Sequence, residues 1–392
     1  MKKRYLYVLT FLSLLCLPGK AQEKTGFWNH GIGKFLKKAD KVIDSWQEAG
    51  VDTTYIRAYK KDRIIYIGAY GYYQQHDMFF PIQIEESDIP ILREYLPSNF
   101  NDTKYMRANM NTFQTEIDLG IDYKGIAIEL PIPIRNRYTK SFGLAKTGSV
   151  WGFRIRYKSI NKLWGTMEDG YNQAIAQWLV NALNDEVAPT TVEKSTIADE
   201  DIDLDVFYVE GYYVFNHRKF CLAASVWGDM IQKKSAGSPF IMFNYYQSNF
   251  RTKDYLFNYE KDAFRNWKAS IGFGYGYNWA FQNGKLCLHA SLIPMISVFN
   301  QLVHHTWGET LFEDDDEYNW DEYNKHYYDA VDNGRSRFVF NAFGRIAASY
   351  SLNDYIQLTL VSNYRQYLYR NNANTRINNR ELDFQFNVGY RF

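Results

Sequence analysis

The chain has 392 residues, and its 45 basic and 44 acidic residues give a formal net charge of +1. This balance argues against a nucleic-acid-binding protein, and no apolar run beyond the N-terminal segment reaches the ~18 residues of a membrane-spanning helix. Aromatic residues make up 18% of the chain, including 33 tyrosines, which favours a membrane β-barrel with aromatic girdles at both interfaces.

The N-terminal segment has the pattern of a secretory signal peptide. Residues 2–4 are basic, 5–17 form an apolar stretch, and small residues then precede Gln22. We therefore expect residues 1–21 to be removed during secretion. Lipidation at Cys16 is the alternative, but the residue before Cys16 is not small, as a lipoprotein signal requires.

Residues 22–52 are predicted to form a periplasmic segment ahead of a barrel at 53–392. Within this segment, apolar residues at helical spacing predict an amphipathic helix over Lys34 to Glu48. Such a helix would plug the barrel, lie on the inner leaflet, or pack beneath the barrel floor. We favour packing beneath the floor.

Alternation of apolar and polar residues indicates strands along the rest of the chain, because successive strand residues face opposite sides of a sheet. The closing segment, Leu382 to Phe392, alternates without a break. The predicted strands are Thr54–Lys60, Arg63–Tyr73, Met78–Ile84, Ile117–Tyr123, Ile126–Ile134, Val150–Tyr157, Asp205–Phe215, Phe220–Ile231, Phe240–Ser248, Trp267–Phe281, Leu286–Val298, Phe338–Tyr350, Asp354–Tyr369 and Leu382–Phe392.

The fold class that these strands predict is all-β: a transmembrane antiparallel up-and-down barrel of about twelve strands, with ten or fourteen as alternatives. Short links at 280–285 and 351–354 alternate with long ones at 249–266 and 300–334, as periplasmic turns alternate with outer loops. The segment Lys158–Leu204 breaks this alternation. It contains a predicted helix over residues 167–183, and its side of the membrane stays open.

The remaining cysteines, Cys221 and Cys287, fall in predicted strands that are not neighbours in sequence. Free buried thiols are favoured over a disulfide, even in an oxidising periplasm.

The polar stripes of the strands are predicted to face the lumen. Candidate lumen-facing residues are His289, Ser291, Arg337, Asn341, Arg345, Gln385, Asn387 and Arg391. Charges of both signs share these stripes, among them Arg154, Arg156 and Arg365 against Glu116, Asp118, Glu129 and Asp383. Opposed charges inside a narrow barrel tend to pair and fill the space, but the sequence leaves open whether the lumen conducts or is blocked.

His289 and Ser291 form the one arrangement that would support a hydrolase. At positions i and i+2 of a strand they share a face, so the imidazole would reach the hydroxyl. The sequence indicates no acidic partner, and the pair falls on the inward stripe rather than towards lipid. We therefore interpret the pair as structural, and we predict no catalytic residue, no metal site and no cofactor.

The aromatic residues Tyr390 and Phe392 end the chain. We expect them to serve as the C-terminal signal read by the barrel-assembly machinery.

Several motifs resemble those of one family. They are Asp52–Ile56, Tyr123–Gly125, Tyr212–Asn216 followed by Lys219-Phe220, and Gln232–Ser238. The family is an outer-membrane barrel group of Bacteroides-type bacteria, catalogued as a domain of unknown function, number 4421. The resemblance covers roughly residues 52–392 and implies a barrel and its location. It implies no activity, so no catalytic residue follows from it.

These patterns favour a non-enzymatic protein of the outer membrane of a Gram-negative bacterium: a pore, a structural protein or a surface-recognition protein. The alternatives are a lipid or lipopolysaccharide hydrolase and a barrel subunit of an uptake or secretion complex. The expected partners are outer-membrane lipid, lipopolysaccharide and the assembly machinery, with a surface or periplasmic protein partner left open.

Overall fold

The computed structural model describes residues 50–392 except 60–62, 82–104, 124, 135–139, 162, 171–193, 198–201, 253–260, 308–333, 337 and 372–373. From Val51 onwards, the described residues belong to one unit. The predicted signal peptide and the helix predicted at 34–48 lie outside the described residues.

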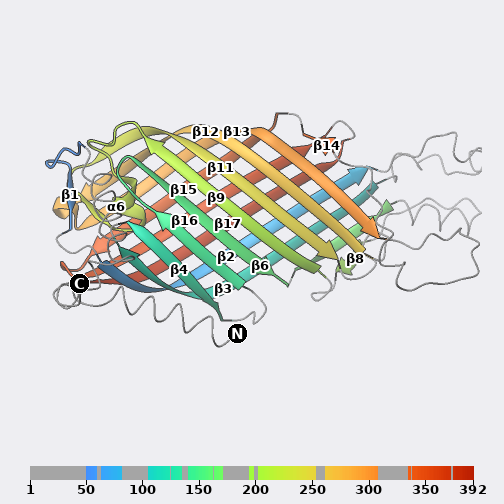
Figure 1. Cartoon of the computed structure of the whole chain (residues 1–392), viewed down its shortest axis with the longest axis horizontal. Coiled ribbons are helices and arrows are strands. Elements are labelled where there is room, and N and C mark those ends of the chain that lie inside the picture. Colours follow the sequence, from blue (N-terminus) through green and yellow to red (C-terminus); the bar gives the residue numbers. More distant parts are fainter. Residues whose placement is uncertain are drawn as a thin grey trace, which may run out of the picture. The chain divides into compact units, whose positions relative to one another are not determined.

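Twelve strands of the described chain close into an antiparallel barrel (Figure 1). They are β2 (Arg63–Pro81), β3 (Tyr105–Tyr123), β4 (Ile126–Pro133), β5 (Lys140–Lys146), β6 (Trp151–Ile160), β9 (Ile202–Val214), β11 (Ala236–Thr252), β12 (Lys261–Phe281), β13 (Leu286–Trp307), β15 (Phe340–Ser351), β16 (Ile356–Arg370) and β17 (Arg376–Arg391). Each pairs with the next in this order, and β17 closes the ring on β2, with Arg391 opposite Ile64. The predicted twelve-stranded barrel is confirmed.

Alternation places apolar residues on the outer wall and polar residues inside. On β17, Phe384 and Phe386 are exposed on the outer wall, whereas Asp383 and Gln385 are buried in the lumen. The same division holds around the ring, so the wall offers lipid an apolar surface. None of the described helices is long and apolar enough to cross a membrane.

The two ends of the barrel differ in the links that join their strands. At one end, strands join through short links such as η2 (Gln282–Gly284) between β12 and β13, and we name it the closed end. At the other, which we name the loop end, β2 finishes and β3 begins.

The segment between β6 and β9 contributes to the wall at the loop end. There β7 (Trp164–Asp169) pairs with the outer part of β3, and β8 (Lys194–Ile197) pairs with β7. Thus β7 takes the place beside β3 that the short strand β4 leaves vacant. The prediction of a helix beginning at residue 167 is wrong for residues 167–169, which belong to β7. A two-residue strand, β14 (Gly334–Arg335), pairs with β13.

The closed end is blocked by the connection between β9 and β11. This connection forms α6 (Leu222–Val226) and β10 (Met230–Gln232), and β10 pairs with β1 (Ile56–Ala58). All five residues of α6 are buried. The strand predicted over 220–231 is therefore wrong for its first part. Its apolar residues alternate well enough for a strand, but the small residues among them allow a helical turn to pack inside the barrel mouth.

Side-chain hydrogen bonds hold this floor in place. Gln232 is fully buried; its Nε2 donates to the carbonyls of Lys219 (2.7 Å) and Lys234 (2.8 Å), and its Oε1 accepts from the N–H of Cys221 (3.0 Å). From the wall, the Ser349 hydroxyl donates to the carbonyl of Ala224 at 2.7 Å. The Gln232 bonds hold the floor segment together, and the Ser349 bond fixes its main chain to the wall.

The two described cysteines are free and buried, as predicted. Cys221 precedes α6 rather than lying in a strand, so that part of the prediction is wrong. Burial raises the pKa of the Cys221 thiol to about 12, which keeps it protonated and unreactive.

The interior is filled along its length. Phe220 and Leu222 of the floor pack in one apolar cluster with wall residues of the closed end, including Phe240 and Ile293. A second apolar cluster fills the loop end, with Phe80, Met110 and Phe264 among its members. Between them lies a layer of buried charges and tyrosines.

Candidate functional site

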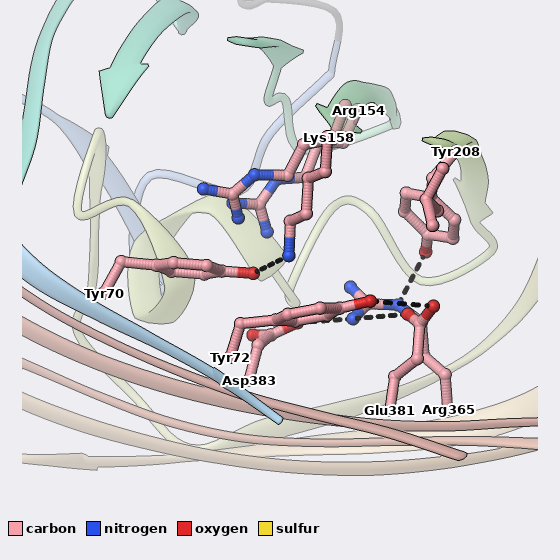
Figure 2. Close-up of a pocket in the computed structure, with 10 residues that line it drawn as sticks. Tyr70, Tyr72, Arg154, Lys158, Tyr208, Arg365, Glu381 and Asp383 are labelled. Atoms are coloured by element: carbon pink, nitrogen blue, oxygen red, sulfur yellow. Dashed lines mark hydrogen bonds and ion pairs between the residues drawn. The ribbon is translucent and has the colours of Figure 1, made fainter. Parts of the chain in front are cut away.

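The charged layer contains the largest concentration of buried ionisable groups in the described chain and is the candidate site. Figure 2 shows eight of its residues by name: Tyr70, Tyr72, Arg154, Lys158, Tyr208, Arg365, Glu381 and Asp383. They come from β2, β6, β9, β16 and β17. Alternation alone brings them inside, because each has the inward parity of its strand.

Arg365 is the centre of one half of the layer. Its guanidinium pairs with Asp383 and lies 3.8 Å from a carboxylate oxygen of Glu210, while its Nε donates to the Tyr208 hydroxyl at 3.0 Å. Glu381 lies at the edge of its reach, 4.0 Å from Nη1. Arg365 therefore contacts groups from β9 and β17 at once.

Glu129 is the centre of the other half. It receives the guanidinium of Arg154 at 3.0 Å, and Arg156 lies 3.7 Å away. Arg154 also donates to Gln385 at 3.3 Å, and Gln385 in turn donates to Asp118. This chain of contacts joins β6 to β4, β17 and β3.

Tyrosine rings separate the two halves. The Lys158 ammonium donates to the Tyr70 hydroxyl at 2.7 Å and lies 3.0 Å from the centre of the Tyr72 ring (Figure 2). Arg156 lies 3.8 Å from the centre of the Tyr70 ring. Cation–π contacts of this kind stabilise a desolvated cation that lacks a full set of carboxylate partners.

Little space remains between these side chains. The cavity that they enclose measures about 20 Å³, and two neighbouring cavities in the lumen have the same volume. A cavity of this size holds about one water molecule. The layer can bind water and hold opposite walls together, but it has no room for a substrate.

Several contacts cross the lumen from wall to wall. The Arg345 guanidinium on β15 pairs with Glu210 on β9 at 2.6 Å, and Gln74 on β2 donates to the Tyr246 hydroxyl on β11 at 2.8 Å. These braces and the pairing of Lys158 with Tyr70 block the cross-section in the part of the chain that the structure describes.

His289 and Ser291 meet as the sequence suggested. The His289 Nε2 lies 3.0 Å from the Ser291 Oγ, and its Nδ1 lies 2.8 Å from the Oδ1 of Asn278 on the neighbouring strand. The three groups have the connectivity of nucleophile, base and orienting residue. The sequence reading missed Asn278, since it looked for an acid.

This relay lies against the floor. His289 is 1% exposed, the Phe220 ring lies 6.0 Å from its imidazole, and the Asn278 amide donates to the carbonyl of Cys221 at 2.8 Å. The relay therefore connects the floor to the wall through Asn278 and His289.

The other candidate lumen residues divide into three groups. Asn341, Arg345, Gln385, Asn387 and Arg391 are buried in the lumen. Ser291 is half-buried. Arg337 lies outside the described residues. Arg391 closes the floor, where its guanidinium lies 3.4 Å from the centre of the Tyr59 ring.

The sequence reading missed the groups that complete the charged layer, namely Lys158, Glu210, Glu381 and the inward tyrosines. Strand parity would have found Glu210, which is inward together with Tyr208 and Tyr212 on β9. Strand parity would not have shown which arginine forms the ion pair with Glu210.

At the end of the chain, Tyr390 is exposed on the outer wall and stacks between Tyr355 and Phe392, with 6.4 Å between ring centres on each side. This outward aromatic cluster lies at the closed end. The role of Tyr390 and Phe392 as an assembly signal stays a prediction.

Comparisons with known proteins give a family and a set of distant folds. A family model described as "Domain of unknown function (DUF4421)" matches residues 50–392. No curated protein matches the chain.

Solved structures that resemble the chain include the outer membrane protease OmpT from Escherichia coli, with 8% identity, 86% of this chain and 98% of that chain covered, and a TM-score of 0.41. The translocator domain of autotransporter NalP from Neisseria meningitidis is 8% identical, with 92% of this chain and 95% of that chain covered and a TM-score of 0.31. The Pseudomonas putida toluene transporter TodX is 8% identical, with 84% of this chain and 90% of that chain covered and a TM-score of 0.28. Similarities this low carry no functional information.

Proposed function

The chain belongs to the DUF4421 family of unknown function, and we propose that it is a closed, non-conducting barrel of the outer membrane with a structural or surface-recognition role. By the usual difference between short periplasmic turns and long outer loops, the closed end faces the periplasm. In this proposal the protein is not an enzyme.

The observation that carries this proposal is the braced lumen. Charged and tyrosine side chains from opposite walls meet within hydrogen-bond distance, and apolar clusters lie on both sides of them. A conducting pore needs a continuous wet path, and cavities of about 20 Å³ in this layer offer only isolated water sites.

The length of the strands supports a role outside the cell. β12 has 21 residues and β13 has 22, whereas about 9–11 tilted residues cross a bilayer. At ~3.3 Å per residue and a tilt of ~45°, such strands rise roughly 50 Å. The outer parts of β12 and β13 would therefore project beyond the membrane, whereas β15 and β16, with 12 and 15 residues, end nearer to its surface.

Planar-bilayer recording tests the closed lumen directly. We expect folded protein to give no steady ohmic steps, because no continuous water path crosses the charged layer. Heat-modifiable migration on a gel would establish that the reconstituted sample is folded. Reproducible single-channel steps from such a sample would contradict the proposal.

A second candidate function, lipid or lipopolysaccharide hydrolysis, is favoured by one observation: the relay of Ser291, His289 and Asn278. A fluorophosphonate probe distinguishes the two. We expect no labelling of the folded protein, because the His289 base is 1% exposed and packs against Phe220 of the floor. Labelling that disappears in Ser291→Ala, but persists in Ser297→Ala on the same inward stripe, would instead support the hydrolase.

A further inference from the structure

The outer wall carries a groove near the loop end that the closed lumen does not explain. It measures about 810 Å³ and crosses the strands from β15 to β3. Six of its lining residues matter here: Phe79, Arg107, Phe338, Phe340, Arg370 and Arg376. All but Phe79 are exposed, and Phe79 is half-buried.

Strand register places two arginines directly opposite each other in this groove. Arg370 on β16 pairs with Arg376 on β17, Arg376 pairs with Phe79 on β2, and Phe79 pairs with Arg107 on β3. Like charges that face each other across a strand pair are destabilising. An opposed arginine pair therefore suggests an anion that offsets the repulsion.

The carboxylate in the groove does not supply that charge. Asp77 is already occupied by Arg107, whose Nε and Nη2 donate to its two oxygens at 3.0 and 3.1 Å. Within the described residues, Arg370 and Arg376 make no ion pair. The Arg370 Nη2 donates to the Asn374 amide oxygen at 3.3 Å, and the Arg376 guanidinium lies 5.6 Å from the centre of the Phe79 ring.

The other end of the groove is apolar. Phe338 is 81% exposed and Phe340 is 73% exposed, which is unusual for phenylalanine in water. They continue towards the loop end the outward stripe of β15, which includes the exposed Ile346 in the apolar wall. The groove is thus amphipathic, with exposed rings at one end and, at the other, guanidinium groups that form no ion pair with any described residue.

We propose that this groove binds the phosphorylated headgroup of an outer-leaflet glycolipid. Arg370 and Arg376 would hold the phosphate, since planar guanidinium groups match phosphate oxygens in bidentate fashion. Phe338 and Phe340 would lie against the attached acyl chains. A free anion would use the arginines but would leave both rings exposed, so a lipid fits the groove better. The inference rests on the proposed orientation in the outer membrane and not on the closed lumen.

Binding of lipid A to the purified full-length protein in detergent tests this inference. We expect bisphosphorylated lipid A to bind about tenfold or more weakly to the double variant Arg370→Gln/Arg376→Gln, because two charge-assisted contacts are lost. Dephosphorylated lipid A should bind the wild type as weakly as bisphosphorylated lipid A binds the double variant. The matched control is Arg265→Gln, an exposed arginine on the outer wall at β12, which should bind like the wild type.

A second readout separates ligand binding from a structural role. Because the two arginines repel each other, the double variant should be at least as stable as the wild type in a urea titration. Unchanged affinity in the double variant, or an equal loss in Arg265→Gln, would overturn the proposal. Inorganic phosphate that displaced lipid A at millimolar concentration would assign the site to a free anion instead. The bilayer recording above reports on the lumen, so the two proposals fail separately.

Discussion

Replacing Arg365 with methionine should lower the free energy of unfolding by about 3–5 kcal/mol, the cost of leaving buried charges without their partner. Arg365 is buried, pairs with Asp383, and reaches towards Glu210 and Glu381. Methionine fills a similar volume, so the loss would come from charge rather than from a cavity. Urea unfolding of the barrel in detergent, followed by tryptophan fluorescence and heat-modifiable migration, measures the change.

Two further variants show whether the effect is electrostatic. The double variant Arg365→Met/Asp383→Leu should recover most of the lost stability, because a buried ion pair replaced by apolar side chains is often neutral. Gln366→Met changes the next residue, which is half-buried and has the outward parity, and should cost less than about 1 kcal/mol. A loss below about 1 kcal/mol for Arg365→Met would mean that the charged layer is hydrated.

Replacing Phe386 with arginine should cost about 2–4 kcal/mol, the penalty for a cation that faces lipid near the middle of the bilayer. Phe386 is 44% exposed on the outer wall, opposite Leu360 on β16 and Ala69 on β2. Its place midway along the closing apolar stripe puts it far from both interfaces. Refolding into lipid vesicles, with the unfolding free energy read from a denaturant titration, measures the penalty.

The conservative variant Phe386→Leu is the control and should stay within about 1.5 kcal/mol of the wild type. Wild-type stability for Phe386→Arg in lipid would mean that this face of β17 meets water. That result would contradict the assignment of the outer wall to the membrane.

Both predictions depend on the same alternation of inward and outward residues. For the inward residues, however, the filled lumen changes the expected cost of a substitution. With an open lumen, an arginine at Gln385 would be harmless. Gln385 is instead 3% exposed and contacts Asp118 and Arg154. A second cation there would lie beside Arg154 in a desolvated layer. A charged residue on the inward face is therefore destabilising unless an oppositely charged side chain is already present to pair with it.

The floor shows a second limit of sequence patterns. Residues 220–231 alternate enough to predict a strand, but part of this segment forms α6 inside the barrel mouth. Short apolar runs fit a strand or a buried helical turn equally well, and the available volume decides between them. Strand length was also underestimated. The predicted strand 63–73 and the described part, 78–81, of the predicted strand 78–84 belong to one strand, β2. Its polar outward residues at the loop end hide the usual contrast between faces.

The sequence by itself determined the class of fold, the parity of the predicted strands, the free cysteines and the family, because each depends on local periodicity or local motifs. It predicted about twelve strands with ten or fourteen as alternatives, and closure of the ring decided the count. Tertiary structure decided which charges meet and whether the lumen is filled. Glu210 and Arg345 are 135 positions apart, and Arg154 and Gln385 are 231 apart. No local pattern encodes such distances. Barrel closure and stagger bring these residues to one level of the lumen, and desolvation there makes their pairing obligatory.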